Sequence, residues 1–173
     1  MFTGCIQQMR HNASRRDLRF NLAFYEGALM TVRRTQIVEA LVSDIHTNIS
    51  RILSGNVTRQ MVFLNEVNDF PFVCMLVEPE TRFHYGAGRK LATLAISLRG
   101  YVHDGDSGET IDLAEDLGID IETAAIQPFA EAHRDLGVEV ANVISFRTDE
   151  GLMSPYGIMD QSINITYEVA ELV

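Results

Sequence analysis

Residues 90–102 alternate between apolar and polar side chains, and this alternation constrains the fold more than any other feature of the chain. Ala92, Leu94, Ile96, Leu98 and Val102 share one parity in the sequence. Neighbouring side chains of a β-strand point to opposite faces of a sheet. The segment is therefore expected to be a long strand that is buried on one face only.

Four other segments are expected to be strands of the same sheet. One covers residues 57–64, and another is the run Phe72–Val77, which is apolar on both faces as a central strand is. Because short connections link these two segments and the long strand, they are expected to form an antiparallel meander. The polar, glycine-containing segment 80–89 is expected to be a hairpin loop. The two C-terminal strands are lined by Val138, Val140, Ile144 and Phe146, and by Ile163, Ile165, Tyr167 and Val169.

Two segments have the three- and four-residue apolar spacing of amphipathic helices. The first covers residues 32–53 and the second covers residues 109–126, with a shorter helical piece between Pro128 and Gly137. The predicted fold class is therefore α+β, with a mainly antiparallel sheet of about five strands and two helices packed on one face. Residues 35–173 are expected to form this single domain, and residues 1–34 an N-terminal arm.

Charge is distributed unevenly along the chain. Residues 1–34 hold six Arg and two acidic residues, whereas the whole chain has a formal net charge of −10. Residues 104–139 hold eleven acidic residues and one Arg. A basic arm on an acidic body can contact an acidic partner or a neighbouring copy of the chain; a solvated tail and a solvated helix face are the alternative. The arm residues expected at such an interface are Arg15, Arg16, Arg19, Phe20 and Phe24.

Composition excludes several classes of protein. No apolar run approaches the roughly 20 residues that span a bilayer, so no membrane association is expected. An acidic body argues against nucleic-acid binding as the main role, because phosphate contacts need clustered Lys and Arg. The two Cys, Cys5 and Cys74, have neither disulfide-framework nor zinc spacing, which fits a reducing compartment. We expect Cys74 to be a buried thiol and the protein to be made in a cytoplasm.

The catalytic and cofactor-binding patterns in the sequence are all incomplete. Gly86–Lys90 is rich in glycine and basic residues, but it lacks phosphate-loop spacing and precedes a strand where such a loop opens a helix. Asp104 and Asp106 resemble part of a calcium loop, but Glu109 stands where the turn needs glycine. We therefore expect no enzyme activity, no cofactor and no metal. A metal-dependent enzyme using His103, Asp104 and Asp106 is the alternative.

The connection between the last two strands, residues 149–157, is longer than a hairpin requires. It combines glycine and proline with three large side chains, Leu152, Met153 and Tyr156. Loops that carry apolar side chains at their tips more often contact a partner than water. Local packing within the subunit is the alternative.

This segment, TDEGLMSPYG at residues 148–157, together with the alternating strand at 163–167, resembles the C-terminal signature of tail terminator (tail-completion) proteins of long-tailed bacteriophages. Residues 55–60, 66–73 and 80–81 are similar to further blocks of that family in the same order. The resemblance covers residues 35–173 in outline. The arm and residues 118–137 depart from the family pattern.

The resemblance implies a structural virion protein without enzyme activity. It implies a ring of six copies that caps the head-proximal end of the tail tube, stops tube polymerisation and offers a head–tail joining surface. The implied partners are other copies of the chain, the tail tube protein, head-completion or neck proteins and, as a further candidate, the sheath protein. Genomic DNA passes through the ring without sequence-specific binding, and assembly takes place in the host cytoplasm. Another head–tail connector, neck or sheath-adaptor protein of similar fold is the alternative.

A closed ring needs two unlike patches on each subunit, because neighbours related by rotation meet head to tail. The basic arm and the acidic body are the candidates for these patches, because opposite charges fix register and partner choice. The hairpin 80–89 and the loop 149–157 are expected to be further interface elements. The acidic residues of the second helix are expected to face the channel, where their charge repels DNA. The predicted interface residues are Arg82, Phe83, Tyr85, Arg89, Asp149, Glu150, Leu152, Met153, Pro155 and Tyr156, and the predicted channel-facing acids are Asp112, Asp116 and Asp120.

Overall fold

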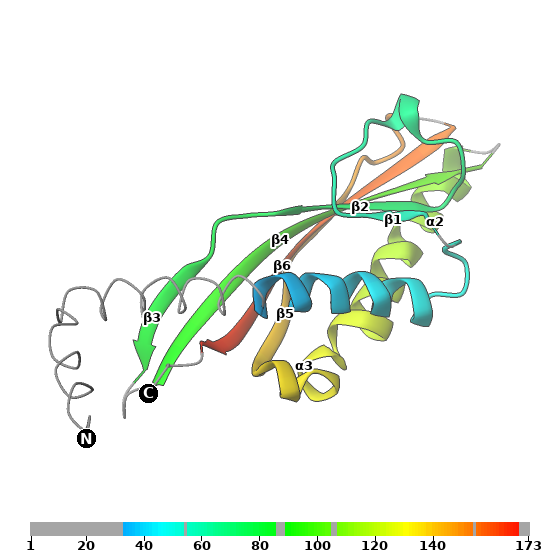
Figure 1. Cartoon of the computed structure of the whole chain (residues 1–173). Helices are drawn as coiled ribbons and strands as arrows, with labels where there is room; N and C mark the ends of the chain where they lie inside the picture. Colours follow the sequence, from blue (N-terminus) through cyan, green and yellow to red (C-terminus); the bar gives the residue numbers. More distant parts are fainter. Residues whose placement is uncertain (1–32, 54, 86–88, 105–106, 154, 170–173) are drawn as a thin grey trace, which may run out of the picture.

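The computed structural model describes residues 33–53, 55–85, 89–104, 107–153 and 155–169 (Figure 1). The expected α+β class is confirmed. The expected arm lies outside the described residues, except for Arg33 and Arg34, which belong to the described part of the first helix. That helix covers residues 33–48, and the labelled elements are β1 (Val57–Thr58), β2 (Phe72–Val77), β3 (Thr81–Tyr85), β4 (Arg89–His103), α2 (Ser107–Ile121), α3 (Phe129–Ala132), β5 (Val138–Thr148) and β6 (Tyr156–Val169).

The strands form one sheet in the order β1-β2-β4-β6-β5, in which β3 also pairs with β4. The expected long strand is confirmed as β4, the centre of the sheet. It pairs antiparallel with β6 on one side, and with β2 and then β3 on the other. Pro79 separates β2 from β3, because proline has no amide hydrogen to donate to a ladder. In Figure 1, β2 and β3 follow one another along the same edge of β4.

The expectation of one strand over residues 57–64 is wrong. β1 ends at Thr58 and pairs in parallel with β2, so the first three strands do not form an antiparallel meander. The cause is local: the Asn56 side-chain amide donates to the carbonyl of Pro71 at 3.1 Å, and the Val73 amide donates to the carbonyl of Asn56 at 2.8 Å. These bonds hold the chain beside the start of β2.

The expectation that the whole of segment 80–89 is a loop is also wrong. Residues 81–85 form β3, which pairs in regular antiparallel register with residues 89–93 of β4. The polar composition of this segment suggests a loop. However, a strand at the edge of a sheet needs no apolar side chains when its backbone bonds are satisfied by its neighbour.

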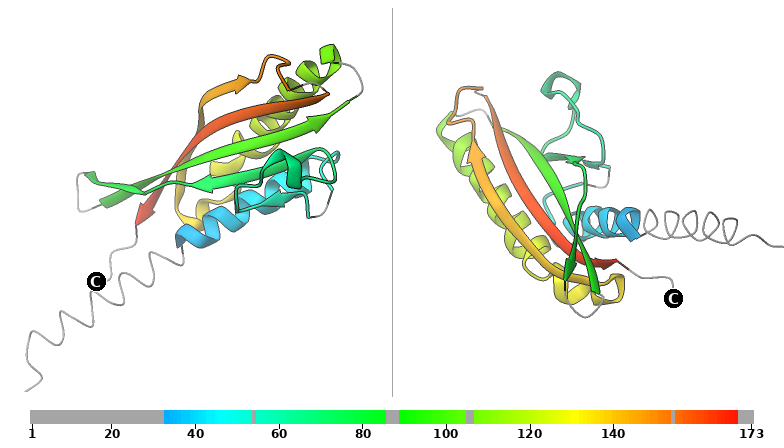
Figure 2. Two further views of the ribbon diagram at one scale, coloured as in Figure 1. Left: turned by 90° about the horizontal axis from the view of Figure 1, so that it is seen from above. Right: turned by 90° about the vertical axis from the view of Figure 1, so that its left-hand side faces the viewer.

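One face of the sheet is covered by helices and holds the main core. The first helix (blue in Figure 1) buries Ile37, Leu41 and Ile45 completely, and α2 buries Leu117 and Ile121 completely. The apolar face of β4 lies beneath them, as its alternation predicts. Figure 2 shows the strong twist of the sheet from two further directions.

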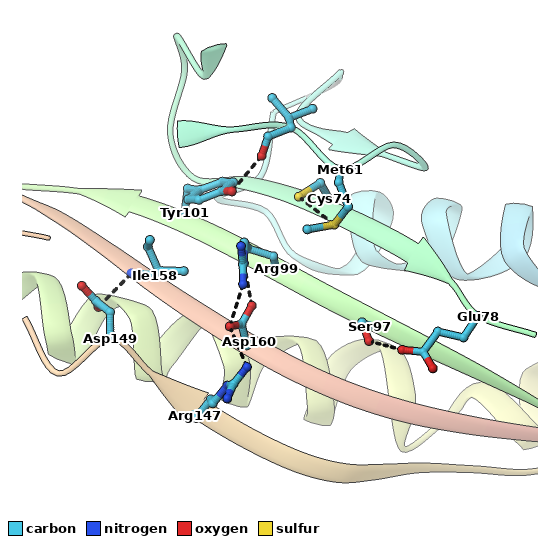
Figure 3. Close-up of polar contacts among 11 residues, drawn as sticks. Met61, Cys74, Glu78, Ser97, Arg99, Tyr101, Arg147, Asp149, Ile158 and Asp160 are labelled. Atoms are coloured by element: carbon cyan, nitrogen blue, oxygen red, sulfur yellow. Dashed lines mark hydrogen bonds and ion pairs between the residues drawn. The ribbon is translucent and has the colours of Figure 1, made fainter. Parts of the chain in front are cut away.

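Among the residues that the structure describes, the opposite face is covered only at one end. There the segment between β1 and β2 folds over the sheet, and Val67, Cys74 and Tyr101 form a second, smaller buried cluster. The Tyr101 hydroxyl donates to the carbonyl of Val62 at 2.7 Å (Figure 3). Cys74 is fully buried, as expected, and its burial raises the pKa of its thiol above the ordinary value. We call the rest of this surface the open face.

Candidate assembly surfaces

The two candidate interface segments lie at opposite ends of the sheet. The β3–β4 hairpin lies where β4 begins, whereas the loop 149–157 lies where β4 ends, since His103 is paired with Tyr156. β4 has 15 residues, and at about 3.3 Å per residue its ends are roughly 45 Å apart. In Figure 1 the loop end is at the upper right and the hairpin end at the lower left. The two segments are thus positioned to contact different partners.

The loop 149–157 is held in shape by the Asp149 carboxylate. Its Oδ2 accepts a hydrogen bond from the Met153 amide and its Oδ1 accepts one from the Ile158 amide, each at 3.0 Å; Figure 3 shows the second. Glu150 and Gly151 follow with φ of 55° and 77°, in the left-handed region that favours glycine at such a turn. The side chain of Leu152 is consequently 86% exposed at the tip, and Met153 beside it is also exposed.

Pro155 and Tyr156 attach this loop to the body of the subunit. The carbonyl of Pro155 accepts a hydrogen bond from the Asp104 amide at 3.1 Å. The Tyr156 ring lies against the rings of Phe70 and His103, with centroids 5.6 and 4.8 Å away. Tyr156 is therefore partly buried, and Leu152 and Met153 are the loop residues whose apolar side chains are most available to a partner.

Replacing Asp149 with Ala is expected to loosen this loop without unfolding the subunit. Two backbone amides lose their acceptor, which costs roughly 1–2 kcal/mol in local stability. Hydrogen exchange of the Met153 and Ile158 amides should accelerate about tenfold, since about 1.4 kcal/mol corresponds to a factor of ten. Asp112→Ala, which removes an exposed carboxylate from α2, is the control for loss of charge. Unchanged exchange at both amides would show that Asp149 does not hold the loop.

At the hairpin end, Glu80 connects β3 to the body of the sheet. Its almost fully buried carboxylate accepts a hydrogen bond from Arg82 Nε at 2.5 Å and another from the Tyr167 hydroxyl. Burial, and then the bond to Glu80, raise the pKa of Tyr167 above its ordinary value. The Phe83 side chain is 41% exposed. The side chains of Tyr85 and Arg89 lie outside what the structure describes.

The open face is lined by short polar side chains and one ion-pair network. The Thr93 and Thr166 hydroxyls are 3.1 Å apart across β4 and β6. Further along, Asp160 of β6 accepts two hydrogen bonds from Arg99 of β4, at 2.6 and 3.0 Å, and lies 3.5 Å from an Arg147 nitrogen of β5 (Figure 3). The bond to Asp160 raises the pKa of Arg99 further. One carboxylate thus connects three strands.

Neither Glu80 nor this network is among the residues predicted from the sequence. The sequence does contain a partial signal for the ion pair. Arg99 and Asp160 are charged residues on the polar faces of two strands whose side chains alternate between polar and apolar. Such a pair can be found only once the register between the strands is known. In the structure Arg99 lies directly opposite Asp160.

The three predicted channel-facing acids have different surroundings. Asp112 and Asp116 are exposed on the outer side of α2. Asp120 forms an ion pair with Arg51, with a nitrogen–oxygen distance of 2.6 Å. The predicted arm residues Arg15, Arg16, Arg19, Phe20 and Phe24 all lie outside the described residues.

The residues of the metal-enzyme alternative are only partly described. His103 belongs to the aromatic cluster of Tyr156, and Asp106 lies outside the described residues. Among the described residues there is no group of three or more His, Cys, Asp or Glu side chains that could hold a metal ion. No helix within the described ranges has both the length and the apolar character needed to cross a membrane.

Comparison with known proteins gives two findings. Residues 29–173 match a family model described as bacteriophage tail tube terminator protein. The tail tube terminator protein p142 of Escherichia phage T5 is 25% identical to the chain in an alignment 153 residues long; the match covers 78% of this chain and 93% of that protein. The family match includes both ends of the sheet and excludes most of the basic arm.

Proposed function

The chain belongs to the bacteriophage tail tube terminator family, and on that premise we propose that it forms a ring of six copies that ends the tail tube on its head-proximal side and provides the head–tail joining surface. The family is one of structural proteins, so the chain is a component of the virion tail that associates with tail tube components. We propose three features beyond this: the ring of six copies, its head-proximal position and its binding of a head-side partner.

The observation that carries the proposal is the separation of two unlike surfaces by the length of the sheet. The loop end presents the apolar side chains of Leu152 and Met153, while the hairpin end presents the charged side chain of Arg82. In a ring whose axis runs roughly along the strands, these ends become the two faces of the ring. One face then binds the last ring of the tube, and the other binds a head-completion or neck protein.

Termination follows from this asymmetry. A tube grows while each added ring offers the next one the same docking surface. A ring that copies this surface on one face only is added once and cannot be followed by another tube subunit. One end of the molecule thus binds the tube, and the other end does not bind further tube subunits.

Polymerisation of purified tube protein, with and without the full chain, tests this function. We expect added chain to stop elongation and to be found at a single end of each tube. Binding along the whole tube wall, or tube lengths that do not respond to the chain, would contradict termination.

Within this proposal, the exposed acids of α2 face the DNA channel. The double variant Asp112→Lys with Asp116→Lys is expected to slow DNA ejection several-fold. The effect should be stronger at low salt, because Lys attracts phosphates that the acids repel. Asp120 is left in place because its loss would also break the ion pair with Arg51. Ejection kinetics from particles carrying the double variant give the measurement.

The matched control reverses two acids at another exposed site, Glu66 and Asp69, in the segment between β1 and β2. An ejection rate that stays at the wild-type value in both low and high salt for the α2 variant would exclude these acids from the channel wall.

A further inference from the structure

We propose that neighbouring subunits of the ring join edge to edge, with β5 of one copy pairing antiparallel with β3 of the next. This inference rests on the proposed ring and adds to it the two contacting edges, their relative direction and their register. The occupant of each edge is a second copy of this chain.

The first edge is β5. Within the described part of the chain it pairs with β6 alone, so its outer side carries no strand. It is an eleven-residue strand without proline, and Val140, Ile144 and Phe146 are 44%, 59% and 40% exposed. Long edge strands with exposed apolar side chains are templates for pairing with another chain, and proteins usually block them. Apart from its two register shifts, this edge is unblocked among the described residues, and such an edge indicates a partner.

The second edge is β3, on the other side of the sheet. β3 pairs with β4 alone among the described residues, whereas the neighbouring β2 is covered by β1 opposite Val73 and Cys74. The side chains of residues 81–84 are all exposed, including that of Phe83. Each subunit therefore has one uncovered strand on each of its two lateral sides, as a head-to-tail ring requires.

The direction of the strands agrees with this junction. β3 is antiparallel to β4, β4 to β6, and β6 to β5, so β3 and β5 of one subunit run in opposite directions. Rotation about a ring axis preserves the sense in which each strand runs along that axis. β5 of one copy therefore meets β3 of the next in antiparallel orientation, which continues the alternation within each subunit.

The pattern of side chains selects a register. Val140 and Asn142 lie on the open face because they pair with Thr166 and Asn164 of β6. Thr81 and Phe83 lie on the same face because they pair with Thr93 and Leu91 of β4. Placing Phe83 opposite Val140 joins two apolar side chains, and the same register places Thr81 opposite Asn142, which are both polar.

The irregularities of β5 limit the junction to a short ladder. Register shifts interrupt β5 between Val138 and Val140 and between Val143 and Ser145, and leave residues 140–143 as a regular stretch. Within one subunit, Val140 and Thr81 lie at the same position along the strand direction. Val140 pairs with Thr166, which pairs with Thr93, which in turn pairs with Thr81. Pairing Val140 of one copy with Phe83 of the next therefore shifts the two subunits by two residues along the strand direction. A sheet that closes on itself requires a stagger of this kind.

The charges near the two edges have opposite signs. Residues 81–90 contain three Arg or Lys residues and no acidic residue, whereas residues 131–139 contain three acidic residues and one Arg. Opposite charges at the two edges favour contact between unlike edges and disfavour contact between two copies of the same edge.

Paired cysteine substitutions in the full chain test this junction. The variants are Phe83→Cys with Val140→Cys, and Thr81→Cys with Asn142→Cys, both at exposed edge positions. Each is assembled with tube protein, treated with an oxidant or a short bis-maleimide, and separated on a non-reducing denaturing gel beside the wild-type chain, which carries Cys5 and Cys74. We expect both double variants to give a ladder of covalent multimers that ends at the size of the ring.

Single variants and a distant pair provide the controls. Neither Phe83→Cys nor Val140→Cys alone should give covalent dimers, because a ring interface never brings the same residue of two copies together. Phe83→Cys combined with Leu152→Cys should also stay monomeric, since these positions lie at opposite ends of the sheet. Circular dichroism identifies any variant that does not fold, and the second double variant then carries the test.

Each remaining outcome overturns a defined part of the account. Dimers from Val140→Cys alone would show a two-fold contact between two β5 strands and overturn the junction. Rings that assemble without cross-links from either double variant would overturn the junction and leave the proposed function standing. A chain that stays monomeric with tube protein and forms no cross-links would overturn both.

Discussion

Replacing Leu152 with Asp is expected to block one of the two assembly steps at the ring while leaving the subunit folded. The side chain is 86% exposed, so its loss removes nothing from the core. At the centre of an apolar contact, a buried carboxylate without a partner is strongly unfavourable. Truncating a central anchor commonly costs about 2 kcal/mol or more, which corresponds to roughly a 30-fold loss of affinity.

Complementation of a phage that lacks this chain, followed by electron microscopy, measures the effect. The yield of complete particles should fall by a similar factor, and the species that accumulates identifies the partner of the loop end. Overlong tubes would assign the loop to the tube, and finished tails without heads would assign it to the head side. Ile119→Asp, at another exposed apolar residue, on α2, is the matched control. A normal yield from Leu152→Asp would remove the loop from the assembly surface.

The second large effect is expected at Gly157, where β6 begins beside α2. A Cβ atom at this position would lie 2.5 Å from the carbonyl oxygen of Thr110 and 2.8 Å from a methyl carbon of Val102. The carbonyl belongs to the backbone of α2 and can move only with the helix. Gly157→Ala is therefore expected to lower the free energy of unfolding by about 3 kcal/mol, the upper part of the range for overpacked cores.

Gly118→Ala gives the comparison for this prediction. A Cβ atom there would lie 2.1 Å from the ring of Phe146, but this ring is partly exposed and can turn toward solvent. Alanine also favours a helix over glycine by about 1 kcal/mol. Urea unfolding of the two variants should show a large loss for Gly157→Ala and a small one for Gly118→Ala. Equal midpoints for Gly157→Ala and the wild type would contradict the close packing of β6 on α2.

Periodicity predicts those parts of the fold in which one face is buried and the other is open. The alternation of residues 90–102 and the helical spacing around Leu41 both correspond to elements of the structure, because burial on a single face determines them. β1 and β3 were not predicted correctly because their structure depends on neighbours: the Asn56 hydrogen bonds position β1, and the edge of β4 positions β3.

The candidate surfaces also include features that the local sequence determines and features that depend on distant residues. The exposure of Leu152 could be anticipated from the composition of its loop. The partial burial of Tyr156 could not, because Phe70, which covers it, is distant in the sequence. The separation of the hairpin from the loop follows from the length of β4, which the sequence predicts. Its consequence for function becomes clear only when the order of the strands in the sheet is known. The interface roles of these residues stay predictions.

The proposed function requires that each subunit carries two unlike assembly surfaces at opposite ends of one sheet. Termination, head joining and the edge-to-edge junction all use this arrangement. In the proposed ring, the ends supply the two faces, and the lateral strands β3 and β5 close it. An error in the junction would leave the two faces intact, whereas an error in the position of the ring would remove both functions.

Cryo-electron microscopy of purified tails tests this claim most directly. We expect one ring of six copies at a single end of each tube, with the loops 149–157 on one face of the ring and the β3–β4 hairpins on the other. Copies distributed along the tube wall, a ring at both ends, or a ring that carries both segments on the same face would contradict it.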